Sequence, residues 1–359
     1  MAHFAQFYKM VYFEREDSSF PTPTYAEASV GKTKPQTSNL KPFSPVVTHV
    51  HILIFHPAPG YTLLPAWTMR FYFYIRKRPP LCKTLNFCLR CFKSSTQTYK
   101  AIIMATSKTI VLIHGNFVNN KSWAAWKSHY EQKGYTVHTP ANPGHDGDPA
   151  ALRQNVHPDL VKTGFVDVVN NLVRLIDSLP EKPLIIGHSM AGMASMKLLE
   201  LGKASAAVSI DGAPPKNVFP PFTTLKAVLP AFGFLSGKPF FMGSRAWYDK
   251  CFFNTLPEQE RGPAFDRFAV PESYKVSREL VLNSFSNIDF NKPHAPLLFI
   301  GGGSDNIFPP SLTKTLAGKY ADPGSRVDLK VFEGKSHFIC GEPGWEKVAD
   351  FILDWYEKL

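Results

Sequence analysis

Short apolar runs recur along the chain from residue 108 onward and predict the strands of a buried sheet. Residues 108–115, 183–186 and 296–305 begin as apolar, β-branched runs, and each run leads into a loop that contains glycine. Residues 327–334 alternate between apolar and polar positions. Continuous apolar runs are typical of parallel strands that are covered on both faces. We therefore expect a mostly parallel sheet whose loops gather at its carboxyl edge.

Two other segments have the pattern of helices. An apolar, helix-favouring stretch at 193–201 follows the second run. Residues 344–359 close the chain, and their apolar side chains recur at helical spacing at Trp345, Val348, Phe351, Ile352 and Trp355. Strands that alternate with helices in this way predict the α/β class.

The turn after the second apolar run is the most informative stretch. Residues 187–191 have the sequence Gly-His-Ser-Met-Ala, which places Ser189 between a strand and a helix with a small residue two positions to either side. A sharp turn there exposes the hydroxyl and sets it at a helix N-terminus, where N–H groups can face an oxyanion. Where the usual motif ends in glycine this chain has Ala191, and Gly192 follows it. By itself the motif also fits an ordinary strand–helix turn.

An aspartate and a histidine follow later predicted strands. Asp305 lies in the glycine-rich loop after the run that begins at 296, and His337 follows the alternating run. A serine hydroxyl becomes a good nucleophile only when a base takes its proton, and the base needs an anion to fix its tautomer. Loops that follow parallel strands meet at one edge of the sheet. We therefore expect Ser189, His337 and Asp305 to form a catalytic triad.

The loop after the first run predicts a place for an oxyanion. It has the sequence His114-Gly115-Asn116, and its backbone lies at the same sheet edge. We expect the N–H groups of Met190 and Asn116 to hold the oxyanion, with Phe117 as an alternative to Asn116. We expect His114 to brace the loop and not to act as a base.

Together these motifs resemble the α/β-hydrolase superfamily, in its compact single-domain esterase branch. The resemblance covers residues 106–359, and the segments that carry it are 113–116, 143–146, 187–191, 303–305 and 334–337. It implies an α/β-hydrolase fold, which is a mostly parallel, doubly wound sheet with a helical cap insertion. It also implies that Ser189 is the nucleophile, His337 the general base and Asp305 the acid that orients it.

Alternatives remain open for the acid. Asp211 lies directly after the next strand, where some relatives place this residue, and Asp289 is less well placed. We favour Asp305 because its loop directly precedes the strand that delivers His337.

The resemblance also indicates which reaction to expect. Haloalkane dehalogenases and epoxide hydrolases of this fold need an aspartate nucleophile where this chain has Ser189. Hydroxynitrile lyases typically carry a threonine and a lysine where this chain has Gly115 and Phe338. We expect a serine carboxylic-ester hydrolase that acts through an acyl-enzyme on short to medium acyl or aryl esters. A lactonase, a cofactor-free perhydrolase and a non-catalytic ligand receptor of the same fold are the alternatives.

Residues 213–285 interrupt the strand pattern with many aromatic residues and prolines. By resemblance this insertion forms a helical cap over the nucleophile, with an apolar pocket beneath it. Most of its aromatic residues are expected to form the insertion's own core. Phe117, Val118 and Phe338, together with Met190, adjoin the triad in sequence and are therefore the candidates for the substrate pocket.

Charge separates residues 1–105 from the rest of the chain. This segment holds 13 Lys and Arg against 4 Asp and Glu, while the whole chain of 359 residues carries a formal net charge of +11. It lacks sustained periodicity, so we expect a poorly ordered or non-native extension, with Met104 as the natural start of the protein. A basic arm that binds a membrane or a partner is the alternative. The hydrolase domain is then residues 106–359.

Composition also narrows the expected partners and cofactors. No basic face on a recognisable module predicts nucleic-acid binding, and the apolar run at 50–55 is too short to span a bilayer. Five scattered cysteines without a visible secretory signal favour reduced thiols in a cytoplasmic protein. His138, His145 and His157 are expected at the surface or in loops and not as metal ligands. We expect a small-molecule ester substrate, no cofactor, no metal and no stable membrane insertion.

Overall fold

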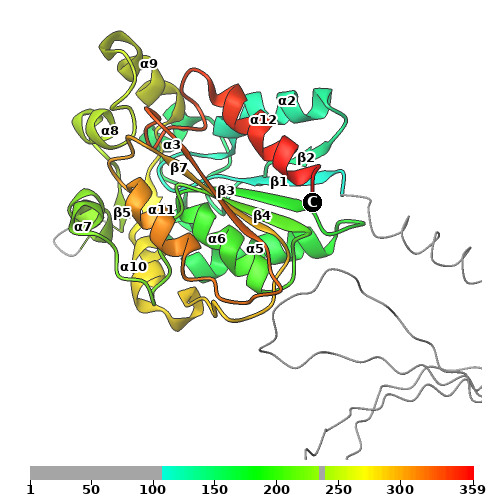
Figure 1. Cartoon of the computed structure of the whole chain (residues 1–359). Coiled ribbons are helices and arrows are strands. Elements are labelled where there is room, and N and C mark those ends of the chain that lie inside the picture. Colours follow the sequence, from blue (N-terminus) through cyan, green and yellow to red (C-terminus); the bar gives the residue numbers. More distant parts are fainter. Residues whose placement is uncertain (1–106, 234–238) are drawn as a thin grey trace, which may run out of the picture. The chain divides into compact units, whose positions relative to one another are not determined.

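A six-stranded, fully parallel sheet forms the centre of the protein (Figure 1). The computed structural model describes residues 107–233 and 239–359, so the expectations for residues 1–105, Met104 included, lie outside it. The strand order is β2-β1-β3-β4-β7-β8. The strands are β1 (Thr109–Ile113), β2 (Thr136–His138), β3 (Leu184–His188), β4 (Ala206–Ile210), β7 (Leu297–Gly302) and β8 (Val327–Phe332). This is the parallel α/β sheet that the apolar runs predict.

The strand order places the loops after β1, β3 and β4 next to one another. β1 lies between β2 and β3, so the chain runs outward to β2 and then crosses back to β3. Ligands of open α/β sheets bind at such a reversal, beyond the carboxyl ends of the strands. The register pairs Ile113 with Gly187 and His188 with Ile210. The loops after β1, β3 and β4 therefore begin at nearly the same level.

Helices cover both faces of the sheet, which explains why its central strands β1, β3 and β4 are buried at every position. Val111 and Ile185 belong to one hydrophobic layer, together with residues of α5, α6 and α11. Their neighbours Leu112 and Ile186 belong to the other layer, with α2 and α12, and Figure 1 shows these two helices on the side of the sheet opposite α5 and α6. The covering helices are α2 (Ala124–Gln132), α5 (Phe165–Asp177), α6 (Met190–Glu200), α11 (Pro310–Ala317) and α12 (Trp345–Tyr356).

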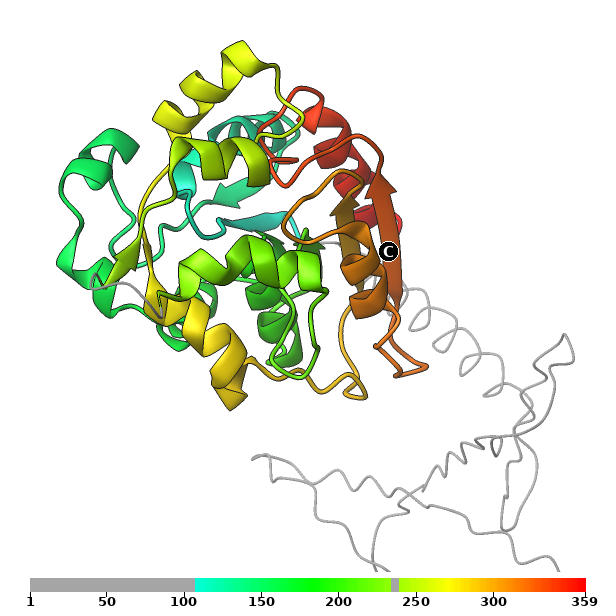
Figure 2. The ribbon, with the colours of Figure 1, turned by 90° about the vertical axis from the view of Figure 1, so that its left-hand side faces the viewer.

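The segment between β4 and β7 is largely helical, as the loss of the strand pattern predicts. In Figure 1 its helices α7, α8 and α9 lie together on the left of the sheet, and Figure 2 shows them from that side. The segment also contains a two-residue antiparallel pair, β5 and β6, that the sequence pattern did not predict. Its elements are α7 (Phe222–Val228), η2 (Leu229–Phe232), β5 (Phe240–Phe241), α8 (Arg245–Cys251), α9 (Glu258–Phe268), β6 (Glu272–Ser273), α10 (Tyr274–Leu282) and η3 (Ser284–Ser286).

Three short helices complete the connections between the strands. They are η1 (Asn120–Trp123), α3 (Pro149–Gln154) and α4 (Pro158–Lys162).

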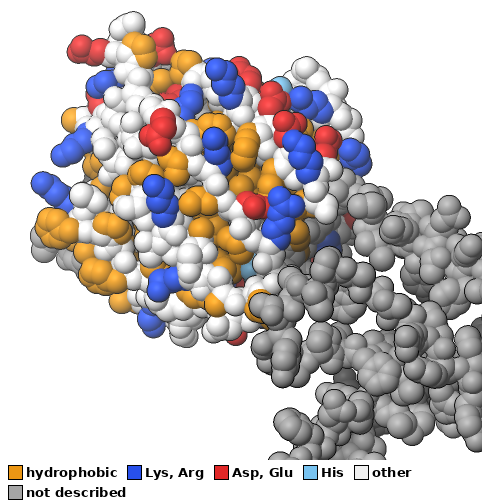
Figure 3. Space-filling model, viewed as in Figure 1, with side chains coloured by type: hydrophobic (Ala, Val, Ile, Leu, Met, Phe, Trp, Pro, Cys, Tyr) orange, Lys and Arg blue, Asp and Glu red, His pale blue; other side chains and the backbone are white. Residues whose placement is uncertain are grey.

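The face seen in Figure 3 carries interspersed charges, with hydrophobic side chains gathered over α7, where Phe219 and Phe222 are exposed. Among the described residues no helix has the length and apolar character needed to cross a membrane.

Candidate active site

Ser189 is the single residue between β3 and α6, and its backbone is strained. Its φ of 60° and ψ of −121° are unusual for a residue other than glycine. Three backbone hydrogen bonds hold this conformation. The Ser189 N–H donates to the carbonyl of Ile210 (2.9 Å), and the Ser189 carbonyl accepts from Gly192 (2.9 Å) and Ala213 (3.0 Å). The strain is therefore fixed by β4 and by the first turn of α6.

Close backbone contacts explain which positions around Ser189 must be glycine. A Cβ atom on Gly187 would lie 2.0 Å from the Ala191 carbonyl oxygen, and one on Gly192 would lie 2.6 Å from Cα of Gly212. A Cβ on Gly115 would lie 2.7 Å from Cβ of Ser189. Position 191 already holds an alanine. The departure from the usual motif is therefore accommodated, because the tight approach occurs at Gly192.

His337 joins Ser189 and Asp305 in one hydrogen-bonded chain. Its Nε2 atom lies 3.0 Å from Oγ of Ser189, and its Nδ1 atom lies 2.6 Å from Oδ2 of Asp305. The side chains of His337 and Asp305 are fully buried. An aspartate on Nδ1 favours the tautomer that leaves the lone pair of Nε2 directed at the serine hydroxyl. The structure thus brings together the three residues that the sequence predicts as a triad.

Backbone N–H groups of its own loop hold Asp305. Its Oδ1 atom accepts from Ile307 (2.6 Å) and Phe308 (2.9 Å), which leaves Oδ2 for His337. The alternative acid Asp289 is exposed and accepts a hydrogen bond from the N–H of Asn291, away from these groups. Of the two acids that the sequence leaves open beside Asp305, Asp289 is therefore not at the site.

The other alternative, Asp211, lies beside the triad. It is fully buried directly after β4, and its Oδ1 atom accepts a 2.6 Å hydrogen bond from the N–H of Gly302. Burial and then the nearby charge of Asp305 raise the pKa of the Asp211 carboxyl well above its usual value. His337 makes its Nδ1 hydrogen bond to Asp305 and not to Asp211.

Three groups that the sequence pattern did not single out surround His337. The rings of Phe252 and Phe308 meet its imidazole edge to face, with ring centroids 4.9 and 5.4 Å away. His188 contacts the His337 carbonyl through Nε2 at 2.8 Å. Burial and the neighbouring His337 lower the pKa of His188, so His188 is neutral and its Nε2–H donates this bond. The only sequence signal for these roles is that His188 stands next to Ser189.

The loop after β1 lies against Ser189 and is braced from within. The backbone N–H of Asn142 donates to Nε2 of His114 (3.0 Å), and Nδ1 of His114 contacts the Gly115 carbonyl (2.9 Å). Burial and the neighbouring His145 lower the pKa of His114 to about 3, so this ring is neutral. The expectation that His114 braces the loop is confirmed.

Both predicted oxyanion donors have N–H groups without a partner in the described part of the chain. Neither the N–H of Met190, at the start of α6, nor that of Asn116 donates a hydrogen bond there. Phe117, the alternative to Asn116, has a positive φ of 69°. Its carbonyl accepts hydrogen bonds from the Tyr248 hydroxyl (2.7 Å) and from the N–H of Val270 (3.0 Å). The insertion therefore helps to shape this loop.

The three predicted pocket residues separate in the structure. Val118 and Phe338 line a small recess beside the site, together with Phe252 and His188. Phe117 does not line this recess, because its ring packs into a cluster with Phe241, Trp247 and Phe252.

His145 lies in a loop, one of the two positions expected for it, but not at the surface. It is buried, and its Nε2 atom is 3.1 Å from Oε2 of Glu272, which is buried as well. Burial is the largest single effect and would lower the pKa of His145, but the charge of Glu272 together with the hydrogen bonds to Glu272 and to the Pro143 carbonyl raises it. This ion pair fastens the loop after β2 to β6 of the insertion.

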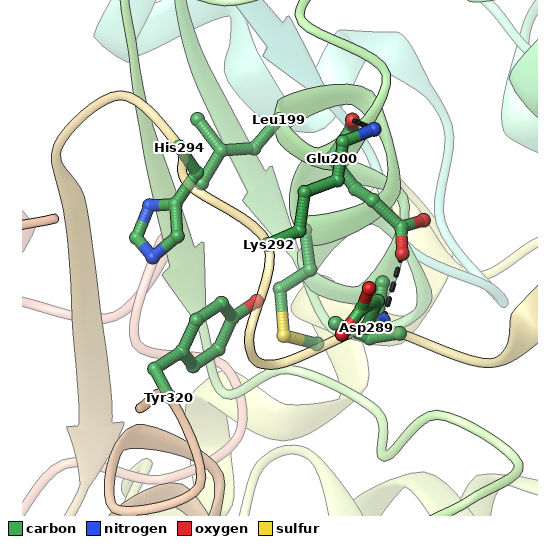
Figure 4. A pocket seen from close by; sticks show the side chains of 8 residues that line it. Leu199, Glu200, Asp289, Lys292, His294 and Tyr320 are labelled. Atoms are coloured by element: carbon green, nitrogen blue, oxygen red, sulfur yellow. Dashed lines mark hydrogen bonds between the residues drawn. The ribbon is translucent and has the colours of Figure 1, made fainter. Parts of the chain in front are cut away.

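The described residues contain one group of possible metal ligands at the triad and one small pocket away from it. His188, Asp211 and His337 could in principle hold a metal ion, with ligand atoms within 4.8 Å of one another, but they are part of the hydrogen-bonded site already described. A second small pocket involves the end of α6, and Figure 4 shows His294 and Tyr320 facing Glu200 across it. It shares no residue with the triad.

Solved structures that share this fold include a methylesterase and a lipase. A methylesterase from Arabidopsis has a TM-score of 0.52 and 14% identity, over 70% of this chain and 99% of that chain. A monoacylglycerol lipase from Paleococcus ferrophilus has a TM-score of 0.53 and 19% identity, over 71% and 96%. Methylketone synthase I of tomato, complexed with 2-tridecanone, has a TM-score of 0.50 and 18% identity, over 71% and 99%. At these identities the likeness shows the fold.

A sequence-family match identifies the family of this chain. No curated protein matches the chain significantly. A family model described as the Alpha/beta hydrolase family matches residues 110–351, which include β1 from its second residue, the other five strands of the sheet, and Ser189, Asp305 and His337. The chain therefore belongs to the alpha/beta hydrolase family.

Proposed function

We propose that this protein is a serine carboxylic-ester hydrolase that works through an acyl-enzyme. The observation that carries the proposal is the buried chain from Ser189 Oγ through His337 to Asp305, with contacts of 3.0 and 2.6 Å. A strained serine at a helix N-terminus, with an imidazole nitrogen beside its hydroxyl, is suited to nucleophilic attack on a carbonyl.

In the first half-reaction, Oγ of Ser189 bonds to the ester carbonyl carbon and its proton passes to Nε2 of His337. The carbonyl electron pair moves onto oxygen, and the N–H groups of Met190 and Asn116 donate hydrogen bonds to this oxyanion. The bond to the alcohol oxygen then breaks, and the alcohol leaves with the proton from His337. Asp305 stabilises the imidazolium between these two transfers.

In the second half-reaction, water attacks the acyl-enzyme and gives its proton to His337. The bond between the acyl carbon and Ser189 Oγ breaks, the acid departs, and Oγ regains the proton. Each proton that His337 accepts is returned, so the cycle needs no cofactor.

The surroundings of the triad support apolar esters of limited size. The recess beside His188 has apolar walls at Val118, Phe252 and Phe338 and about 10 Å³ of free space. Such walls suit acyl or aryl chains, and the small free space favours short ones. We propose short to medium acyl or aryl esters as the substrate class, with the insertion at 213–285 as the cap.

The test is hydrolysis of p-nitrophenyl esters from acetate to longer acyl chains. Ser189→Ala should lower kcat by at least about 10³-fold. Ser195→Ala is a matched control, because Ser195 is buried in the same helix and its hydroxyl donates to the Ala191 carbonyl. It should retain activity. A Ser189→Ala enzyme as fast as the wild type would contradict the proposal.

The proposed catalytic unit is residues 106–359. A chain that begins at Met104 should hydrolyse the same esters at the same kcat/KM as the full chain. Loss of folding or activity in the shorter chain would assign residues 1–103 a necessary role.

A further inference from the structure

A second buried carboxyl group stands beside the triad, and the proposed mechanism does not use it. Asp211 follows β4 with a positive φ of 43°, which is uncommon for a residue other than glycine. Its N–H donates to the Ile300 carbonyl (2.8 Å), and its Oδ1 accepts from the N–H of Gly302 (2.6 Å). The backbone N–H and the carboxyl group of Asp211 are thus both hydrogen-bonded to β7. The side chain is held in place with no access to solvent.

The carboxyl group of Asp211 lies at the Asp305 side of the histidine. One of its oxygens and ring nitrogens of His188 and His337 all lie within 4.8 Å of one another. Oδ2 of Asp305 lies 2.6 Å from Nδ1 of the same His337, so the two buried carboxyl groups meet at one imidazole, and the charge of Asp305 acts on Asp211. Two buried carboxylates placed in this way cannot both be ionised without strong repulsion. One proton must therefore reside on the pair.

The hydrogen-bond donors show which member of the pair carries that proton. Asp305 accepts three N–H groups, from Ile307, Phe308 and His337, and such donors stabilise an ionised carboxylate. Asp211 accepts one, from Gly302, and no N–H or O–H of the described residues donates to its Oδ2. An ionised Oδ2 would be a buried charge without a donor, which is costly. A protonated Oδ2 would need an acceptor, and the carboxylate of Asp305 is the neighbouring acidic group that acts on it.

The charged groups around Asp211 also favour its neutral, protonated form. Asp305 and Glu342 are the acidic groups that act on it, and both disfavour its ionised form. His188, one of the two neighbouring imidazoles, is neutral, because burial and His337 lower its pKa. His337 directs Nδ1 at Asp305.

We infer that Asp211 is a neutral carboxylic acid whose O–H donates a hydrogen bond to Asp305 and thereby positions this carboxylate against Nδ1 of His337. The inference rests on the proposed function, since it concerns the same triad. Asp211 touches neither Ser189 nor the substrate in this scheme, so it is a positioning residue. Asp211 acts as a neutral hydrogen-bond donor, whereas the triad acid Asp305 acts as an anion.

This distinction predicts opposite results for the same substitution at two neighbouring positions. In Asp211→Asn the amide oxygen can accept from Gly302, and the amide N–H can donate to Asp305, as the protonated acid does. Asp211→Asn should therefore keep kcat and KM within about threefold of wild type. Asp305→Asn removes the anion on His337 and should lower kcat by about 10³-fold or more.

Asp211→Ala removes the donor without replacing it. We expect kcat to fall about tenfold with little change in KM, because Asp305 then lacks one of its positioning bonds. Circular dichroism and thermal unfolding report whether the alanine variant is folded. The asparagine variant keeps the test decisive if the alanine variant is not.

Two results would overturn the inference. An inactive Asp211→Asn enzyme would mean that the negative charge of Asp211 is needed, and an Asp211→Ala enzyme with wild-type kcat would mean that Asp211 positions nothing. Ser189→Ala separates these outcomes from failure of the proposed function. If Ser189→Ala retains full activity, the triad is not the catalytic site, whatever the Asp211 variants do.

Discussion

The hydroxyl of Tyr248 donates a 2.7 Å hydrogen bond to the carbonyl of Phe117, 131 residues away in the sequence. Tyr248 is fully buried in α8 of the insertion, and Phe117 follows the predicted oxyanion donor Asn116. The N–H of Val270 donates to the same carbonyl. Two groups of the insertion thus hold a loop residue whose φ is 69°. The insertion takes part in shaping the loop beside Ser189.

We therefore predict that Tyr248→Phe lowers kcat for p-nitrophenyl esters by about tenfold, with KM nearly unchanged. The substitution removes one of the two bonds to Phe117 and leaves the aromatic ring in place. Steady-state kinetics measure the effect. Tyr130→Phe is the matched control, because its buried hydroxyl donates to the Ala349 carbonyl on the other face of the sheet. Equal kcat values for both variants and the wild type would refute the role of Tyr248.

The buried pair of His145 and Glu272 predicts a pH-dependent contribution to stability. The charge of Glu272 and the hydrogen bonds to Glu272 and the Pro143 carbonyl together outweigh burial, so the pKa of His145 lies above its value in the unfolded chain, which is about 6.5. The contribution is therefore fully present below about pH 6.5 and is lost as the pH rises through the folded-state pKa. His145→Gln should lower the free energy of unfolding by about 3 kcal/mol near pH 6.

Urea unfolding of wild type and His145→Gln at about pH 6 and about pH 9 measures this difference. The difference in free energy of unfolding between wild type and His145→Gln should be smaller at the higher pH. His129→Gln serves as a control, because His129 pairs with Asp350 at the surface, where such a pair contributes little. A gap of constant size at both pH values would show that His145 contributes through packing and not through its charge.

The turn at Ser189 predicts unequal effects for two small substitutions. Gly192→Ala places a Cβ 2.6 Å from Cα of Gly212 and should lower stability by about 1–3 kcal/mol. Ala191→Gly restores the usual motif and should cost at most about 1 kcal/mol, the usual helix penalty of glycine. Thermal unfolding of the two variants measures both. A larger loss for Ala191→Gly would contradict the contact argument.

The recess lined by Phe338 predicts a change in chain-length preference. Phe338 packs on Phe253 and Phe268 and lines the recess beside His188. Phe338→Ala should raise kcat/KM for p-nitrophenyl octanoate relative to acetate, by about tenfold, since extra methylenes then find apolar space. The ratio of the two kcat/KM values is the measurement.

Phe351→Ala provides the comparison for this prediction. Phe351 is a partly buried aromatic residue of α12 that packs on Phe332 of β8, remote from the recess. It should leave the octanoate-to-acetate ratio as in wild type. An unchanged ratio in Phe338→Ala would mean that the acyl chain binds elsewhere.

The meeting of Ser189, Asp305 and His337 follows from local patterns along the chain. Ser189 and Asp305 follow apolar runs and His337 follows an alternating run, and parallel strands carry the loops after them to one sheet edge. Short apolar runs and small flanking residues are properties of neighbouring positions, so the sequence alone indicates them. Their catalytic roles stay predictions that the substitutions above test.

Contacts between distant segments were not predictable in the same way. His145 was expected at the surface or in a loop, but Glu272, 127 residues later, arrives on β6 and pairs with it in the interior. Phe117 stays a predicted pocket residue, but no local pattern indicated that its ring packs on Phe241 and Trp247 of the insertion. Aromatic residues of an insertion carry no local signal that says which face inward.

The sequence by itself determined the α/β sheet, the serine turn and the order of the three candidate residues, because hydrophobic period and turn chemistry are local. Only the tertiary structure decided that Asp305 and not Asp211 meets His337, and that Tyr248 holds the first loop. These contacts depend on where β4, β7 and the insertion pack against one another. That packing is the sum of many long-range contacts, which no short stretch of sequence contains.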